Sequence, residues 1–332
     1  MKKITMQTIA NKLNISKNSV SIALRGKDGV SKETRERVIE LANKLDYHYF
    51  SRKSKQHDTV IKTFALVSTD FTLELKSFFG VILDELQKII TSKHYKLVIF
   101  KISNKEQEKN GLPVELASIK WDGIFVLSFI TNDYIKKILS LKIPVILIDY
   151  HNSEIESDSI LTQNIDGMER GIAYLARRKI KSIGFIGNTN FSPSYYERLI
   201  GFYSGIKKYN LQVNENYVIT SIPEDHQKDL FNYLASLKKM PDAWVTVNNG
   251  YGLAVMSFLH SKGYTIPEDV SILSFDNTDL SRTSHPQMSV IATDLKQMAK
   301  EAFSAMNYRL KFPYKSHRQI LLLPALIKRE SA

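Results

Sequence analysis

The sequence contains no cysteine, which excludes disulfides, thiolate metal sites and cysteine nucleophiles. No apolar run approaches the roughly 18 residues that a membrane-spanning helix needs. The two lysines near the N-terminus are not followed by the apolar block of a secretory signal. We therefore expect a cytoplasmic protein that makes no contact with a membrane.

Motifs for common catalytic chemistry are missing as well. The eight histidines include no pair at i, i+4 and no His-Glu-x-x-His, so nothing supports a zinc hydrolase. No Gly-x-Ser-x-Gly elbow and no Walker loop occurs, and no Gly-x-Gly-x-x-Gly follows the first apolar run of the chain's main body. We expect no catalytic residues, no metal and no cofactor.

Positive charge is concentrated at one end of the chain. Residues 1–57 hold 13 Lys and Arg against 5 Asp and Glu, whereas the rest of the 332-residue chain holds 33 against 29. Such a concentration is typical of proteins that bind a polyanion. The alternative is a basic tail that only aids solubility, and this alternative weakens if the basic segment folds.

The basic segment has the pattern of three short helices. Thr5, Ser16 and Ser31 can each cap a helix, and Asn14 suits the left-handed exit of the first one. Apolar residues recur at helical spacing after each cap: Ile9, Ala10 and Leu13; Val20, Ala23 and Leu24; Val38, Leu41, Ala42 and Leu45. This order predicts a helix-turn-helix domain, with a bundle that binds no ligand as the alternative.

The second helix carries residues that its buried stripe does not need. Asn18 can pair with adenine, Lys17 can reach guanine, and Ile22 can touch a thymine methyl group. Lys32, Arg35 and Arg37 suit phosphate contacts, which position a protein without specifying sequence. The candidate DNA-binding residues are Thr5, Ser16, Lys17, Asn18, Ser19, Ser21, Ile22, Arg25, Lys32, Arg35, Arg52 and Lys53. For Lys17 and Asn18 the alternative is plain solvent exposure.

The rest of the chain alternates between short apolar runs and amphipathic stretches. The runs are 64–67, 97–100, 123–127, 145–148, 183–187, 243–247 and 270–275. Runs of this kind predict parallel strands buried on both faces, and the alternation predicts doubly wound α/β architecture in two subdomains. Ligands of such sheets bind beyond the carboxyl ends of the strands.

Polar residues follow most of these runs. They include Asp70, Ser128, Asp149, Asn188, Asn248, Asn249, Asp276 and Asn277. Carboxylates and amides can bind a polyhydroxyl solute, because each hydroxyl both donates and accepts hydrogen bonds. Each residue can instead cap the helix that follows it.

Residues 4–47 resemble the DNA-binding domain of the lactose/galactose repressor (LacI/GalR) family. Residues 242–302, YYERLIGF at 195–202 and LPALIKRES at 323–331 are similar to motifs of the same family. The resemblance implies a helix-turn-helix domain joined to a periplasmic-binding-protein-like core. By these motifs Arg198, Asn248 and Asp276 fall on positions that bind the effector, often a sugar. The candidate effector-binding residues are Asp70, Ser128, Asp149, Arg198, Asn248 and Asp276.

The resemblance also implies a domain plan. Residues 1–47 form the DNA-binding domain, 48–60 the hinge or linker, and 61–332 the effector-binding and dimerisation core. The N-subdomain takes about 61–161 and 292–321, and the C-subdomain about 162–291 and 322–332. Many family members insert a hinge-helix Leu between base pairs, and the equivalent position here is Gln56.

These observations predict a sequence-specific transcriptional regulator, expected to be a repressor. It would bind a pseudo-palindromic operator in double-stranded DNA as a homodimer, under the control of a small-molecule effector, expected to be a carbohydrate. One alternative is a cytoplasmic solute-binding protein or sugar-processing enzyme with an incidental basic head. Another is a regulator controlled by a protein partner.

Overall fold

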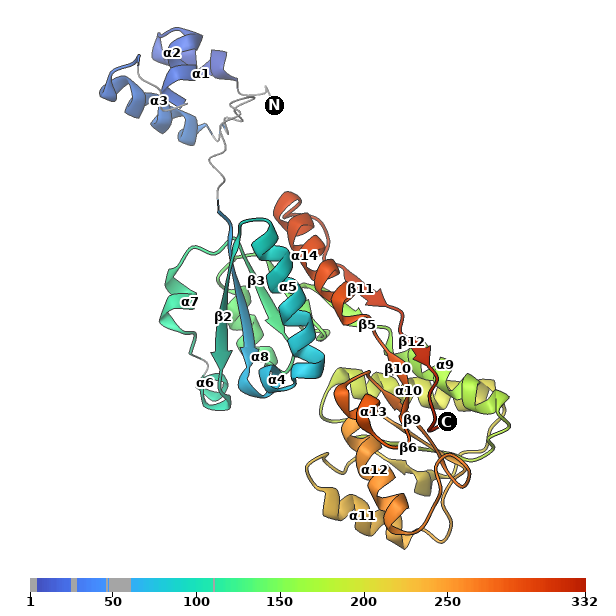
Figure 1. Cartoon of the computed structure of the whole chain (residues 1–332). Coiled ribbons are helices and arrows are strands. Elements are labelled where there is room, and N and C mark those ends of the chain that lie inside the picture. Colours follow the sequence, from blue (N-terminus) through green and yellow to red (C-terminus); the bar gives the residue numbers. More distant parts are fainter. Residues whose placement is uncertain (1–4, 25–28, 46, 48–60, 110) are drawn as a thin grey trace. The chain divides into compact units, whose positions relative to one another are not determined.

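Three short helices make up the first of two units into which the chain divides, residues 1–60, and two sheets make up the second, residues 61–332 (Figure 1). The structure is a computed structural model. It describes all residues except 1–4, 25–28, 46, 48–60 and 110. Each unit has its own hydrophobic core.

The helices of the first unit are α1 (Met6–Leu13), α2 (Lys17–Leu24) and α3 (Lys32–Lys44). Thr5 caps α1 in a capping box with Thr8, and Asn14 ends α1 with a φ of 55°. The predicted caps at Thr5, Ser16 and Ser31 are confirmed, because each hydroxyl accepts a backbone N–H three residues later. The core of this unit consists of Ile9, Ala10, Val20, Ala23, Val38 and Ala42. The predicted order of three helices is therefore confirmed.

Ser21 departs from the prediction. We expected its side chain to lie outside the buried stripe of α2, but the residue is only 5% exposed. The reason is that α2 packs against both α1 and α3, so its buried arc is wider than one stripe. A small hydroxyl side chain fits in this arc.

The first sheet has the strand order β11-β5-β4-β3-β1-β2, and all its neighbours are parallel. Its strands are β1 (Thr63–Thr69), β2 (Lys96–Ile102), β3 (Gly123–Leu127), β4 (Val145–Ile148), β5 (Asp158–Thr162) and β11 (Gln319–Leu322). Its helices are α4 (Asp70–Glu74), the π-helix η1 (Lys76–Gly80), α5 (Val81–Ser92), α6 (Asn104–Glu108), α7 (Val114–Ser118), α8 (Asn132–Leu139) and α14 (Leu295–Lys311). We call this sheet with its helices the first lobe.

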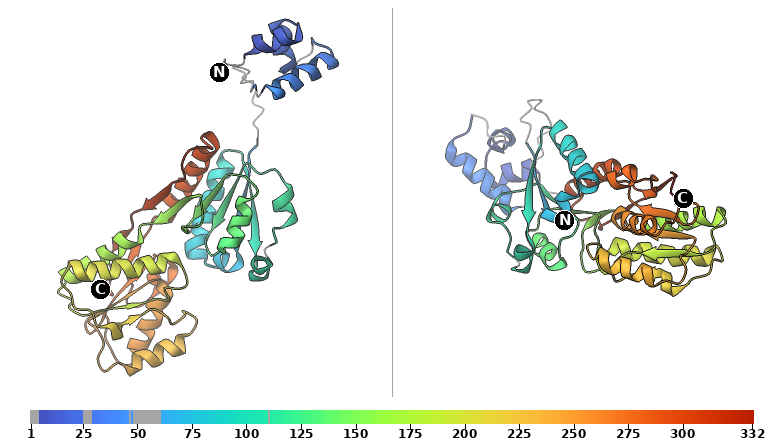
Figure 2. Two further views of the ribbon diagram at one scale, coloured as in Figure 1. Left: turned by 180° about the vertical axis from the view of Figure 1, so that it is seen from behind. Right: turned by 60° about the horizontal axis from the view of Figure 1, so that its bottom comes forward.

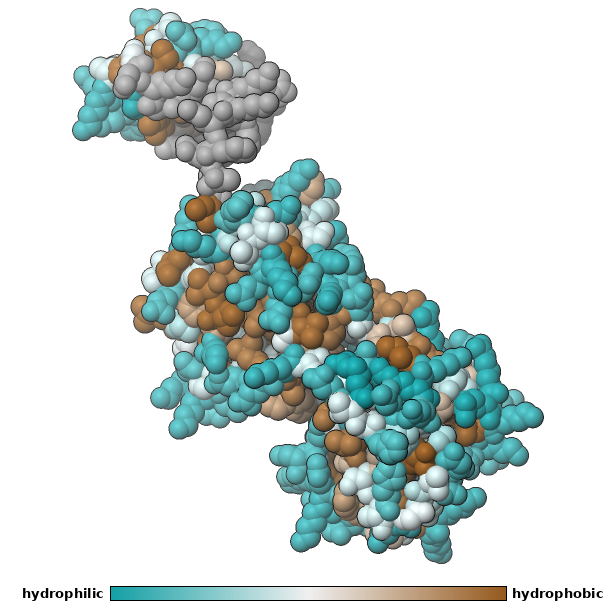
Figure 3. All heavy atoms as spheres, viewed as in Figure 1, coloured by the Kyte–Doolittle hydropathy of each residue, from teal (hydrophilic) through white to brown (hydrophobic). Residues whose placement is uncertain are grey.

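Both faces of the first sheet are covered, which explains its continuous apolar runs. Phe64 and Leu66 of β1 point into one core with residues of α5 and α14, and Ala65 and Val67 point into another with residues of α8. Strand β2 lies at one edge of the sheet. On the surface of this lobe, hydrophobic side chains lie among the hydrophilic ones (Figure 3).

The second sheet has the order β12-β10-β9-β8-β6-β7 and is parallel except for the pair β10–β12. Its strands are β6 (Ile183–Ile186), β7 (Val218–Ile219), β8 (Ala243–Thr246), β9 (Ser271–Phe275), β10 (Ser289–Ala292) and β12 (Ala325–Ile327). Its helices are α9 (Asn164–Arg177), α10 (Pro193–Lys208), the 3₁₀ helix η2 (Glu215–Tyr217), α11 (Gln227–Ser236), α12 (Asn249–Ser261) and α13 (Asp279–Thr283). We call this sheet with its helices the second lobe.

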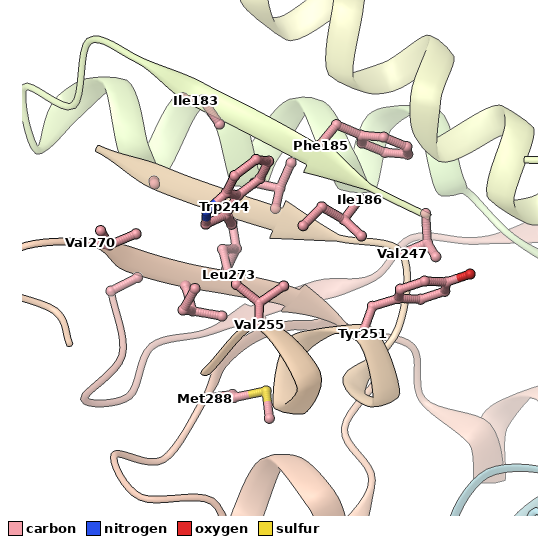
Figure 4. Close-up of a cluster of buried hydrophobic side chains, with 14 of the residues drawn as sticks. Ile183, Phe185, Ile186, Trp244, Val247, Tyr251, Val255, Val270, Leu273 and Met288 are labelled. Carbon is pink, nitrogen blue, oxygen red and sulfur yellow. The ribbon is translucent and has the colours of Figure 1, made fainter. Parts of the chain in front are cut away.

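Trp244 of β8 is fully buried in the core of the second lobe (Figure 4). Tyr251 and Val255 of α12 point from one side toward the sheet in the same view. The buried face of α12 thus fixes the N-terminal end of this helix against the strand ends of β8 and β9.

The chain passes between the two sheets three times. Strands β1 to β5 build the first sheet and β6 to β10 the second, then β11 returns to the first sheet and β12 to the second (Figure 2). The predicted fold class, a three-helix domain plus two doubly wound parallel-sheet lobes, is confirmed. Among the described residues no helix has both the length and the apolar composition needed to cross a bilayer.

Candidate recognition helix and ligand cleft

The N-terminal end of α2 presents the residues predicted to read bases. Lys17 and Asn18 are exposed, and the Ser16 hydroxyl accepts the Ser19 backbone N–H at 2.9 Å. The Ser16 and Ser19 hydroxyls also lie 2.9 Å apart. The cap therefore fixes the first turn of α2 and leaves its two long polar side chains in solvent, as contact with a DNA groove requires.

The other predicted DNA-binding residues have varied surroundings. Thr5 is exposed at the start of α1, Ile22 is half-buried, and Lys32 and Arg35 lie in the first turns of α3, exposed and half-buried respectively. Ser21 is buried, as described above. Arg25, Arg52, Lys53 and the linker position Gln56 lie outside the described residues.

Three strand ends in the second unit share an unusual backbone conformation. Ser128 after β3, Asp149 after β4 and Asp276 after β9 have φ values of 35°, 56° and 72°. Residues other than glycine adopt this left-handed conformation infrequently, and three of them at the strand ends of one site is a feature that often accompanies function. All three residues line one cavity between the two lobes.

Arg198 reaches the cavity from the second turn of α10, a helix that Ser192 caps and Pro193 begins. Its Nε donates to Asn164 Oδ1 at 2.9 Å, one terminal nitrogen donates to the carbonyl of Val247, and the other lies 3.5 Å from Asp276 Oδ1. The guanidinium also lies 3.9 Å from the ring centre of Phe275. With its side chain 3% exposed, Arg198 is a fixed donor beside Asp276.

Asn248 both caps a helix and lines the cavity. Its Oδ1 accepts the Tyr251 backbone N–H at 3.0 Å, which begins α12. Its Nδ2 donates to the Tyr195 hydroxyl at 2.7 Å and to Glu224 Oε2 at 2.5 Å. The capping and ligand-binding interpretations of Asn248 are thus compatible.

Asp149 has the least compensated carboxyl group of the cavity. Its Oδ1 is buried and has no hydrogen-bond partner. Burial raises the pKa of Asp149 to about 7, although Arg198 acts to lower it. Burial also raises the pKa of Asp276, again against the effect of Arg198. Both carboxyl groups are therefore held where a ligand with donors would stabilise their charged forms.

Aromatic rings from both lobes meet beside this cavity. Phe129 of the first lobe lies 4.9 Å from Phe191 of the second, measured between ring centres. Phe71 lies 5.5 Å from Phe129 and 6.1 Å from Phe191, and Tyr195 lies 5.6 Å from Phe191. Phe71 and Phe191 are about half exposed, so this cluster forms an apolar rim.

The structure brings five of the six predicted effector-binding residues together. Ser128, Asp149, Arg198, Asn248 and Asp276 line the same cavity. Asp70 does not line it, because it begins α4 at the surface, where its carboxylate lies 3.7 Å from Lys101 Nζ. Asn249, which also follows a predicted strand, does line the cavity, although it is mostly buried and its amide donates to the carbonyl of Phe275.

Tyr195 and Glu224 are among the lining residues that the predicted set did not include. Tyr195 precedes Arg198 by three residues, and this spacing places both on one face of a helix. Glu224 lies in the loop after β7. This strand has only two residues, and no apolar run in the sequence predicts it. Tyr195 could have been predicted from its spacing to Arg198, but nothing in the sequence around Glu224 indicates that it lines the cavity.

Two family models match the sequence. Residues 5–49 match the model described as bacterial regulatory proteins, lacI family, and residues 172–332 match the model of a periplasmic binding protein-like domain. The chain combines a LacI-family DNA-binding domain with a periplasmic-binding-protein-like domain. It is accordingly a DNA-binding transcriptional regulator with a ligand-binding core.

The full length of this chain is matched by curated relatives. It is 26% identical to the NTD biosynthesis operon regulator NtdR of Bacillus subtilis, over 98% of this chain and 99% of that one. It is 22% identical to the HTH-type transcriptional repressor PurR of Vibrio cholerae, over 98% and 97%. These relatives are regulators rather than enzymes.

Solved structures share the fold. A complex of the transcriptional regulator CelR with cellobiose matches with a TM-score of 0.73 at 22% identity, covering 99% of this chain and 100% of that one. The lac repressor dimer bound to operator and the anti-inducer ONPF matches with a TM-score of 0.70 at 17% identity, covering 99% of each chain. The fold of this chain is thus that of proteins solved with a sugar and with DNA.

Proposed function

We propose that this LacI-family regulator is a cytoplasmic, non-enzymatic repressor whose operator affinity depends on a carbohydrate-like effector bound between its two lobes. The observation that carries the proposal is the convergence of Ser128, Asp149, Arg198, Asn248 and Asp276 on one cavity. These residues come from both lobes, so a ligand that contacts them all favours one arrangement of the lobes.

The first unit supplies the DNA contacts in this proposal. Asn18 and Lys17 read base edges, while Lys32 and Arg35 contact phosphates. A homodimer places two copies of α2 in successive major grooves of a pseudo-palindromic site. The lac repressor structure, which is a dimer on its operator, supports this arrangement. The DNA contacts of Arg25, Arg52 and Lys53 stay predictions, because these residues lie outside the part of the chain that the structure describes.

The cavity suits hydroxyl groups. Arg198 donates, Asp276 and Asp149 accept, and the Asn248 amide can do both, so neighbouring hydroxyls of one ring can be paired. The rings of Phe129 and Tyr195, which also line the cavity, suit the apolar face of a sugar. The cellobiose bound to CelR supports this class of effector.

Residues 1–47, 48–60 and 61–332 are the DNA-binding domain, the linker and the core of the proposal. Effector binding changes the relative populations of two lobe arrangements, and the linker transmits the change. A coupling free energy of about 1–3 kcal/mol is sufficient, since it changes operator affinity by roughly 5–150-fold.

Asp276→Asn tests the proposal. The variant keeps the size of the side chain but removes the charge beside Arg198, so it should bind operator normally and lose its response to the effector. The measurement is an operator-shift titration with increasing effector. Asp133→Asn, which changes an aspartate in the first turn of α8, is the matched control and should respond like the unmodified protein. A normal response of Asp276→Asn would contradict the site assignment.

A further inference from the structure

The cavity between the lobes carries an excess of negative charge. The charged side chains that line it are Asp149, Glu224, Asp276 and Arg198. One guanidinium therefore faces three carboxyl groups. A neutral sugar can occupy the lone pairs of these carboxylates, but it cannot offset their charge.

Arg198 already bonds to the protein through each of its nitrogens, although its two terminal nitrogens each keep a second N–H for a ligand. Its three nitrogens bond to Asn164, to the carbonyl of Val247 and to Asp276. It offsets the charge of Asp276, because its terminal nitrogen lies 3.5 Å from that carboxylate. The Asp149 carboxylate has no such direct contact with Arg198, and its Oδ1 is buried without a hydrogen bond.

Glu224 is the second carboxylate without a cationic partner among the described residues. It accepts a hydrogen bond from the Asn248 amide, which is neutral. Its position depends on Gly250, because a Cβ atom there would lie 1.7 Å from Glu224 Oε1. The absence of a side chain at position 250 thus admits a carboxylate to the rim of the cavity.

A metal ion is not supported as the missing cation. Within the part of the chain that the structure describes, no three His, Cys, Asp or Glu side chains are grouped to coordinate one. An organic cation fits better, because the lining includes the aromatic rings of Phe129 and Tyr195, and aromatic rings attract cations. The Tyr195 ring already has the Arg198 guanidinium 5.6 Å from its centre, so Phe129 is the ring that is left for a ligand cation.

We infer that the effector of this cleft is an amino sugar, whose ammonium group pairs with Asp149 while its hydroxyls bind Arg198, Asn248 and Asp276. The inference rests on the proposed function, since it names the ligand class of the same cavity. An ammonium group has three donors, so it can satisfy the unpartnered Oδ1 of Asp149 and offset its charge in one contact.

The amount of proton release distinguishes an amino sugar from a neutral one, because an ammonium group stabilises the carboxylate more strongly than neutral hydroxyl groups do. Burial raises the pKa of Asp149 to about 7, and the charged groups that act on it are Arg198, Asp276, Glu197 and His151. Below pH 7 much of the empty site therefore holds the protonated carboxyl group. Binding of an ammonium group favours the carboxylate, so a proton leaves, and the affinity increases as the pH rises from about 5.5 to 7.

The experiment is isothermal titration calorimetry on the full chain. The probes are the 2-, 3- and 6-amino-deoxy derivatives of glucose, with glucose and N-acetylglucosamine as neutral counterparts. We expect at least one amino sugar to bind about 10-fold or more tightly than glucose, in line with a charged hydrogen bond. Titration at pH 6 in buffers of different ionisation enthalpy should show more proton release with that amino sugar than with glucose.

Asp149→Asn keeps the shape of the side chain and removes its charge. The variant should lose the preference for the amino sugar, whereas the control Asp133→Asn should keep it. Failure of every amino sugar to bind, equal affinity for glucose, or proton release no greater than that with glucose would overturn the inference. Glucose bound more tightly than its amino derivatives would leave the proposed function standing. Failure of the proposed function would appear separately, as an absence of operator binding.

Discussion

His151 Nε2 lies 2.7 Å from Glu197 Oε1 and joins the loop after β4 in the first lobe to α10 in the second. The other oxygen of Glu197 accepts from Asn164 Nδ2 at 2.8 Å, and Asn164 Oδ1 accepts from Arg198. A continuous set of polar contacts therefore runs from one lobe to the cavity residue Arg198.

The first prediction concerns the pH dependence of this link. Glu197 raises the pKa of His151 above its usual 6.5, and hydrogen bonds from His151 and Asn164 leave the pKa of Glu197 below 4.5 despite burial. The stabilisation that protonated His151 contributes to the folded protein is complete below pH 6.5, and it is lost as the pH rises through the raised pKa of His151. The glutamate contribution is present above pH 4.5 and is lost as the pH falls.

The link should therefore be strongest between pH 4.5 and 6.5. His151→Gln should lower the free energy of unfolding by about 0.5–1 kcal/mol at pH 5.5 and by less at pH 8.5. Urea unfolding at the two pH values measures the difference. His226→Gln changes an exposed histidine that pairs with Asp229 on its own helix turn, and it is the control. Equal losses at both pH values would argue against an ionic link.

The second prediction concerns base reading. Asn18→Ala should weaken binding to the operator by about 1–3 kcal/mol, because a bidentate contact to adenine is lost. It should leave binding to unrelated DNA nearly unchanged. Fluorescence anisotropy with both duplexes measures the ratio of operator affinity to affinity for unrelated DNA. Asn216→Ala, an exposed asparagine of the second unit, should have no effect, and an unchanged ratio for Asn18→Ala would remove this residue from the recognition surface.

The third prediction concerns phosphate contacts. Lys32→Ala should weaken binding to all duplexes alike, and it should reduce the slope of log affinity against log salt by about 1. We expect a phosphate contact because Lys32 is exposed at the start of α3. The measurement is a salt titration of DNA affinity. A sequence-dependent loss with an unchanged slope would assign Lys32 to base contact instead.

The fourth prediction concerns the buried ion pair that joins helix α14 to strand β5 in the first lobe. Arg309 Nε on α14 donates to Asp158 Oδ2 on β5 at 2.7 Å, with side-chain exposures of 5% and 1%. Arg309→Met should cost about 3–5 kcal/mol, because it removes the guanidinium that bonds to the buried Asp158 carboxylate. That carboxylate then keeps the Arg318 backbone N–H at 2.8 Å and a longer contact with Arg318 Nε at 3.8 Å. Arg282→Met breaks an exposed pair with Asp279 and should cost about 1 kcal/mol or less. Chemical denaturation compares the two, and similar small losses would contradict the structural role.

Each of the seven apolar runs that were predicted to be strands coincides with a strand of the structure. The runs at 123–127 and 145–148 coincide with β3 and β4. Strands β5, β7, β10, β11 and β12 were not predicted, and β7 and β12 contain only two and three residues. Strand β11 alternates between exposed and half-buried positions at the sheet edge, so its pattern was weaker.

The site was predictable where chemistry coincides with the end of a strand. Asp149 and Asp276 follow buried strands, and the rule that ligands bind at those ends led to both. The same rule named Asp70, which lies at the surface beside Lys101, because α4 begins there and carries it away from the cavity. Glu224 depends on the packing of a loop against Gly250, which spacing along the chain does not show.

The most direct test of the account is selection of genomic fragments by the intact protein at low salt, with and without the effector. We expect enrichment of a small set of fragments that share a pseudo-palindromic site, and a change in their retention when the effector is added. Retention of all fragments alike, or of none, would contradict it.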